Sequence, residues 1–174
     1  EPADIVLEGG SNAEPSKSNI KWPWGVWTDG NRLAVSSTES SSVLIWDTFP
    51  THDGQPADLL LMGSGDIGTP RQLTSDGNSL IVGDHNATAA GGNEPGTFFW
   101  TSFPTVDDQP YDFFVVDPLG EQPSAPWLRG DFTDDGRLLM MGDTLHIWDD
   151  LPLSASTPPA LSNLGQGNSG GYDF

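Results

Sequence analysis

The chain has 174 residues, with six Lys and Arg against 25 Asp and Glu, which gives a formal net charge of -19 and a pI near 4.1. This acidic balance argues against nucleic acid and anionic membranes as partners, because both attract basic surfaces. There is no cysteine, which excludes disulfides and thiol nucleophiles, and no apolar run approaches the roughly 18 residues of a membrane-spanning helix. The 21 glycines and 15 prolines disfavour long helices.

In chain order, the first predicted strand lies in the segment Pro2–Leu7, which ends in three apolar residues. The next strand, Gly25–Thr28, ends at Asp29-Gly30. Asp-Gly supplies the positive φ of a tight hairpin, so we expect the run Arg32–Val35 to pair back antiparallel.

A third strand, Ser42–Trp46, precedes Phe49-Pro50, where proline cannot continue a hydrogen-bonded ladder. The fourth strand is Pro56–Leu61, whose Pro-Ala-Asp start matches that of Pro2–Leu7 at a spacing of 54 residues. The same spacing leads to Pro110–Val115, and a degenerate fourth copy stands at Pro159–Leu164.

The Asp-Gly turn and the Trp strand recur with these segments, in one order, three times. The turns with their apolar runs are Asp29–Val35, Asp76–Val82 and Asp135–Met141, and the Trp segments are Ile45–Pro50, Phe99–Pro104 and Ile147–Pro152. Four short strands in about 50 residues is the size of a β-propeller blade. We expect an all-β fold with about three four-stranded antiparallel blades over residues 1–165, and a flexible Gly/Ser/Asn-rich tail over residues 166–174.

The first repeat resembles the repeats of NHL-type propellers. Trp22–Val26 before Asp29-Gly30 looks like their Pro-x-Gly-Val start, and Arg32–Val35 through Ser42–Trp46 looks like their middle strands. Thr51–Leu61 is similar to a bacterial, often secreted, NHL-like subgroup. The resemblance covers roughly residues 2–165, although the second and third repeats lack the Pro-x-Gly start. It implies a propeller fold, for which six blades is a common number.

Three blades cannot close a ring, since propellers have four to eight. We therefore expect part of a six-bladed or larger propeller, completed by another chain or by sequence outside this one. The segment Asp4, Ile5, Val6 and Leu7 has no inner strands of its own, which makes it the candidate assembly strand. We expect it to complete a blade by strand exchange, in a closed dimer in preference to a fibre.

Candidate chemistry is sparse, and we predict no catalytic residue, no metal ligand and no cofactor. His52, His85 and His146 occupy different positions in the repeats, whereas the zinc-dependent lyase among NHL-like propellers draws its histidines from equivalent ones. Calcium stays open as a ligand, because aspartates are abundant, but none shows the spacing of a dedicated calcium loop. Asp4, Asp58 and Asp112 repeat in register, which indicates a structural role.

Tryptophans divide into two groups. Trp46, Trp100 and Trp148 repeat in register, so we expect them to pack between blades, and we expect Trp27 to face a neighbouring blade, opposite to the roles of Leu73 and Phe132. Trp22, Trp24 and Trp127 lie in loops before inner strands. They are candidates to stack on a sugar or anchor a protein, or else they are buried at an assembly seam.

An acidic chain with only Lys17 and Lys21 as lysines suits secretion or high salt. The start at Glu1 leads us to expect that a signal peptide or upstream portion was removed. We expect an extracellular or cell-surface protein, with the periplasm as an alternative. The favoured function is a non-enzymatic scaffold that binds copies of itself or another protein. A lectin-like propeller that uses the loop tryptophans is the alternative, and a propeller hydrolase or lyase is the third reading.

Overall fold

The computed structural model describes residues 2–7, 9, 14–116, 129–141, 145–152, 154–156 and 161–164. Across these ranges the chain is all-β, as predicted, with one 3-10 turn at Gly63–Gly65 as the helical element of the described part. None of the described ranges holds a helix long and apolar enough to cross a membrane. The tail predicted at residues 166–174 lies outside the described residues.

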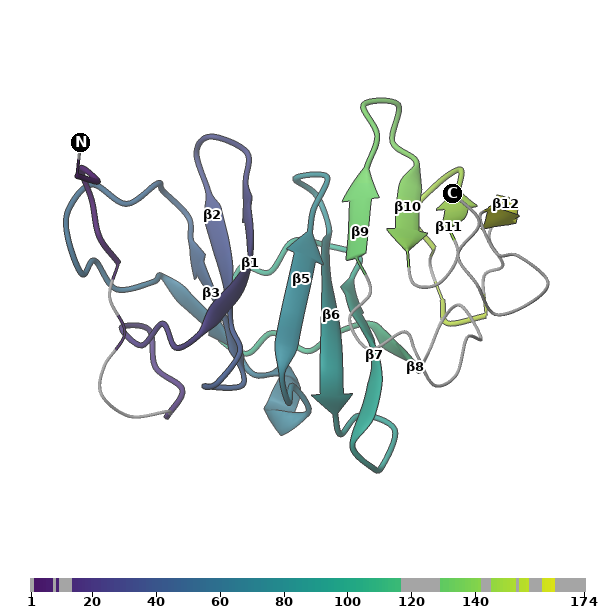
Figure 1. Cartoon of the computed structure of the whole chain (residues 1–174), viewed down its shortest axis with the longest axis horizontal. Coiled ribbons are helices and arrows are strands. Elements are labelled where there is room, and N and C mark those ends of the chain that lie inside the picture. The colour runs from purple at the N-terminus through teal and green to yellow at the C-terminus, as the bar shows by residue number, and fades with distance from the viewer. Residues whose placement is uncertain are drawn as a thin grey trace.

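Three four-stranded antiparallel sheets, each built from consecutive strands, stand side by side in chain order (Figure 1). The first sheet comprises β1 (Pro23–Thr28), β2 (Leu33–Ser37), β3 (Ser42–Trp46) and β4 (Leu59–Leu61). The second comprises β5 (Pro70–Thr74), β6 (Leu80–Ala87), β7 (Glu94–Trp100) and β8 (Phe113–Val116). The third comprises β9 (Arg129–Phe132), β10 (Leu138–Met141), β11 (Leu145–Trp148) and β12 (Leu161–Leu164). The predicted four strands per repeat are therefore confirmed, and a single chain forms three such sheets.

The turn between the first two strands of each sheet is built by the predicted Asp-Gly chemistry. Gly30, Gly77 and Gly136 have φ of +89°, +88° and +88°, a region that glycine enters without steric cost. In the first turn, the Asp29 carboxylate accepts the backbone N–H of Arg32 at 2.7 Å. All three turns point toward the same end of the molecule (Figure 1).

The sheets pack face to face through two apolar clusters. Ile45 and Leu61 of the first sheet meet Phe98 and Trp100 of the second, and these four side chains are buried. Between the second and third sheets, the buried side chains belong to the cluster of Ile81, Phe99, Leu138, Met140 and Trp148. Trp100 and Trp148 therefore pack between sheets, as predicted, and each points toward the sheet that precedes its own.

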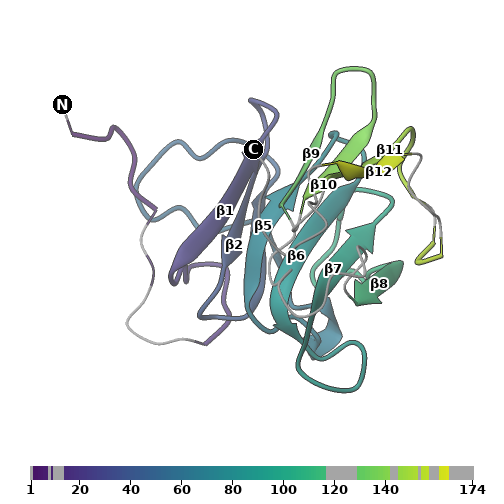
Figure 2. The same cartoon turned by 45° about the vertical axis from the view of Figure 1, so that its right-hand side comes forward.

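The Trp46 side chain points to the corresponding side of the first sheet. There it is covered by residues of the N-terminal segment, whereas a neighbouring sheet covers Trp100 and Trp148. The cluster on this face of the first sheet joins Leu44 and Trp46 with the partly buried Leu7 and Ile20. The N-terminal segment runs along the outer side of the first sheet, away from the other two (Figure 2).

Two of the three in-register aspartates join the outer strand of a sheet to the end of its third strand. The Asp58 carboxylate accepts the backbone N–H of Asp47 at 2.8 Å, and the Asp112 carboxylate accepts that of Thr101 at 2.6 Å. The residues that donate directly follow Trp46 and Trp100. Asp58 and Asp112 thus have the structural role expected for them.

Trp27 faces the neighbouring sheet, as predicted, on the side of its strand opposite to the one that Leu73 uses. Trp27 pairs with Ala34, and Thr74 pairs with Ile81, so Trp27 corresponds to Thr74 and not to Leu73. Trp27 meets the neighbouring sheet where its ring lies 5.4 Å from that of Phe103. The position of Leu73 belongs to Val26, because one step along a strand moves a side chain to the other face.

Phe132 differs from Trp27 for a related reason. In the third sheet Phe132 pairs with Leu138, and the turn between them is one residue longer than the turn between Thr28 and Leu33. The extra residue shifts β9 by one position against β10. Phe132 therefore packs on the cluster between the second and third sheets, the face opposite to that of Trp27.

Candidate functional site

The first sheet has one face that no other sheet covers, and Val26 marks it. Val26 pairs with Val35 in the first sheet as Leu73 pairs with Val82 in the second. Val26 is 62% exposed, whereas Leu73 is 2% exposed. The difference arises because the first sheet covers Leu73, while no described sheet lies on the corresponding side of Val26. We call this side of the first sheet the open face.

Phe49 shows the same contrast at another position of the repeat. Phe49 and Phe103 each follow the Trp of their own sheet by three residues. Phe103 is 8% exposed, because it packs on Trp27 and lies beneath the Arg32 guanidinium at 4.2 Å. Phe49 is 45% exposed. The open face therefore exposes Val26 and Phe49, whereas Leu44 and Trp46 on the same face are buried against Leu7 and Ile20.

Residues 4–7, the predicted assembly strand, are held beside the open face. The backbone N–H of Val6 donates to the Asp53 carboxylate at 2.8 Å, and the N–H of Gly54 donates to the Val6 carbonyl at 2.9 Å. The same two bonds, 54 residues later, join Leu60 of β4 to Asp107 at 3.0 Å and to Asp108 at 2.8 Å.

The segment thus lies against the first sheet as β4 lies against the second. It is not itself in a strand, and among the described residues no strand pairs with it. Residues 4–7 consequently occupy the place of an outer strand whose inner strands are not among the described ones.

Two of the tryptophans predicted to bind a ligand come together at the start of β1. Trp22 and Trp24 are 55% and 46% exposed, and their ring centroids lie 5.9 Å apart, edge to face. The guanidinium of the buried Arg71 lies 4.8 Å from the Trp22 ring and 4.3 Å from the Trp24 ring. Trp22 also has φ of +48°, a conformation that is costly for a residue other than glycine. Trp127, the third candidate, lies outside the described residues.

A polar depression of about 480 Å³ lies where the three hairpin turns meet. Asp29, Asp76 and Asp134 line it, and the first two accept backbone N–H groups of their own turns. The Asp29 pKa falls to about 2, chiefly through the hydrogen bond from the Arg32 N–H. Within the described residues, no three His, Asp or Glu side chains are arranged to hold a metal ion. Asp29 and Asp76 therefore stabilise their turns.

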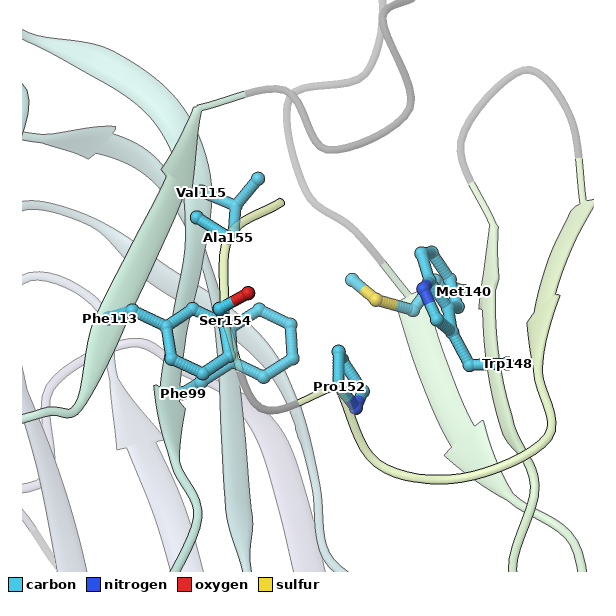
Figure 3. A pocket seen from close by; sticks show the side chains of 8 residues that line it. All are labelled: Phe99, Phe113, Val115, Met140, Trp148, Pro152, Ser154 and Ala155. Atoms are coloured by element: carbon cyan, nitrogen blue, oxygen red, sulfur yellow. The ribbon is translucent and has the colours of Figure 1, made fainter. Parts of the chain in front are cut away.

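A small apolar cavity of about 30 Å³ separates the second and third sheets (Figure 3). It is lined by Phe99, Phe113, Val115, Met140, Trp148, Pro152, Ser154 and Ala155. Its volume is about that of one water molecule, and ligand sites are larger by an order of magnitude. The cavity is a packing gap between two sheets.

Sequence reasoning missed Val26 and Phe49 because both look like ordinary core residues of the repeat. The strand register places Val26 at the position of Leu73. Val26 and Phe49 then stand out because they belong to the first repeat, which has no repeat before it to cover them. Neither protein-family models nor curated proteins match this chain.

Proposed function

We propose that the chain is a non-enzymatic, extracellular scaffold, similar to NHL-type propellers, that binds proteins, including copies of itself. The binding surface is the open face together with residues 4–7. The observation that carries the proposal is the exposure of Val26 at a position where Leu73 is buried. Apolar side chains that are exposed at positions buried in another repeat indicate an interaction surface. A partner that covers them removes apolar area from water.

The substitution Val26→Glu tests the proposal, because it places a charge at the centre of the open face. In sedimentation velocity we expect the wild-type chain to form assemblies heavier than the 18.6 kDa monomer, and the Val26→Glu chain to remain monomeric. Val106→Glu is the matched control, since Val106 is 56% exposed in a loop of the second sheet. A wild-type chain that stays monomeric, with or without calcium, contradicts self-assembly.

A lectin-like function is the second candidate, and the exposed pair of Trp22 and Trp24 favours it. Trp24, predicted to lie in a loop, is within β1, and Trp22 directly precedes this strand. Exposed aromatic faces can stack on sugar rings, and the Arg71 guanidinium lies against both rings of the pair. A glycan array with the wild-type chain and Trp24→Ala separates the two functions. Glycan binding that Trp24→Ala abolishes and Val26→Glu preserves supports the lectin, whereas assembly without glycan binding supports the scaffold.

A further inference from the structure

We infer that the partner on the open face is the third sheet of a second copy, with residues 4–7 of the first copy paired to β11 of the second as its outer strand. The inference rests on the proposed scaffold function and names its partner. Four features of the third sheet match the open face and residues 4–7, and each is a position where one chain leaves a repeated contact incomplete.

The first feature is the carboxylate that joins an outer strand to its sheet. Asp58 and Asp112 perform this role by accepting the N–H that follows Trp46 or Trp100. In the third sheet the residue after Trp148 is Asp149, and the fourth repeat has Ala160 where the carboxylate belongs. Residues 2–7 contain that carboxylate as Asp4. Asp4 of one copy is thus placed to accept the N–H of Asp149 of the other.

The second feature is the outer strand itself. β4 is Leu59–Leu61, and β8 starts with three apolar residues, whereas β12 has Ser162 and Asn163 in the middle. Its pairing with β11 is irregular between Leu145 and Ile147. Residues 5–7, Ile-Val-Leu, have the apolar pattern of β4. By the register of β3 and β4, they would replace β12 with Ile5 opposite Ile147 and Leu7 opposite Leu145.

The third feature is a contact between an arginine and a phenylalanine of neighbouring sheets, of which the third sheet has only the arginine. Arg32 lies over Phe103 and donates to the Gly77 carbonyl at 2.7 Å, which links the first sheet to the second. Arg137 holds the same position in the third sheet, since Leu138 pairs with Trp148 as Leu33 pairs with Trp46. Its side chain is 52% exposed and forms ion pairs with Asp135 at 3.5 Å and Asp149 at 3.7 Å, with no phenylalanine beside it among the described residues.

The second sheet has Ser79 at this arginine position, and the third has Leu151 at the phenylalanine position. Phe49 and Arg137 are therefore the two members of this contact that one chain leaves unmatched. On docking, Arg137 of the second copy lies over Phe49 and donates to the Gly30 carbonyl.

The outward face of the third sheet is apolar as well. Leu139 and Ile147 are register partners, at the positions of Ala34 with Ile45 and of Ile81 with Phe99. Those two earlier pairs are buried against the sheet that follows, whereas Leu139 and Ile147 are only partly buried. Docking therefore covers apolar side chains on both copies. On one copy these are Val26 and Phe49 of the open face, and on the other they are Leu139 and Ile147 of the third sheet.

Mixing two variants tests this partnership. Val26→Glu blocks the open face and leaves the third sheet intact, whereas Leu139→Glu does the reverse. We expect each variant alone to be monomeric, and an equimolar mixture to form a 1:1 dimer through the one intact pair of surfaces. Arg137→Glu, at an exposed site, repeats the test if Leu139→Glu does not fold, as judged by circular dichroism. A mixture that stays monomeric while the wild-type chain assembles overturns the inference and leaves the scaffold function standing.

Because the chain has no cysteine, a cross-link reports the strand pairing directly. We mix Ile5→Cys with Ile147→Cys and expect a disulfide-linked dimer on a non-reducing gel, since register partners on antiparallel strands come within disulfide reach. Ile5→Cys with Leu139→Cys, one strand further in, is the control. We expect at least tenfold less dimer there, and an Asp4→Ala change to reduce the yield of the first pair. Equal yields from the two pairs would overturn the pairing, and a wild-type monomer would overturn both the inference and the scaffold function.

Discussion

The Ser36 hydroxyl donates a hydrogen bond to the Arg71 carbonyl at 2.6 Å and accepts one from the Gly25 N–H at 2.7 Å. A single buried oxygen thus joins β1 and β2 to the first strand of the second sheet. We predict that Ser36→Ala lowers the free energy of unfolding by about 1–3 kcal/mol, because two buried backbone groups lose a partner. Urea unfolding measures the change. Ser102→Ala, at an exposed site, is the control, and an equal effect of both substitutions would show that the bridge has no special weight.

Gly25 is the second point where these sheets meet closely. A Cβ at this position would come within 2.4 Å of the Arg71 carbonyl oxygen, which belongs to the backbone of β5. We predict that Gly25→Ala destabilises the chain by about 1–3 kcal/mol, because the two strands must move apart. Thermal unfolding by circular dichroism checks this. Gly92→Ala should be close to neutral, since nothing lies within 4 Å of a Cβ there. An unchanged melting temperature for Gly25→Ala would mean that the sheets separate easily.

Asp29 links stability to pH. Its folded pKa of about 2 lies below the ordinary value of 3.8, chiefly because the Arg32 N–H hydrogen-bonds the ionised carboxylate. A lowered pKa gives a stabilisation that is present above about pH 4 and is lost as the pH falls toward about 2. We predict that Asp29→Asn flattens the acid limb of the stability curve in this window. Urea unfolding at several pH values measures it, with Asp150→Asn as an exposed control. An acid limb as steep as that of the wild type would contradict the assignment.

Assembly of this chain should strengthen with salt. Each copy has a net charge of -19, so docking brings like charges together. Raising the ionic strength from 0.1 to 1 M shortens the screening length from about 10 Å to about 3 Å, which reduces this repulsion. We expect the dissociation constant from sedimentation equilibrium to fall at least several-fold. A constant that rises with salt would instead indicate that ion pairs between the copies dominate the contact.

The strands were predictable because local chemistry determines where each begins and ends. Asp29-Gly30 requires a turn, Pro50 ends a ladder, and the position of Asp58 relative to Trp46 repeats exactly. The face on which a side chain lies was harder to predict. Trp27 and Leu73 differ by one position in the strand register, and one position is enough to exchange the two faces of a strand.

The open face could not be predicted from single residues. Val26 and Leu73 have similar hydrophobicity and matching positions, and only the order of the sheets in space makes one exposed and the other buried. Residues 4–7 were identified from the repeat alone, because their Asp and apolar residues match β4. Their hydrogen bonds to Asp53 and Gly54 depend on a loop that no repeat pattern describes.

The tryptophans at the ends of β3, β7 and β11 give the row of sheets a direction, since Trp100 and Trp148 point toward the sheet before their own and Trp46 points to the corresponding side, where the N-terminal segment lies. A row with a direction has two unlike ends, and the docking proposed above joins the third sheet of one copy to the first sheet of the next. Copies that dock in this way follow one another in a single sense. The rotation from one sheet to the next then decides whether such a series returns to its start as a ring or continues as a filament.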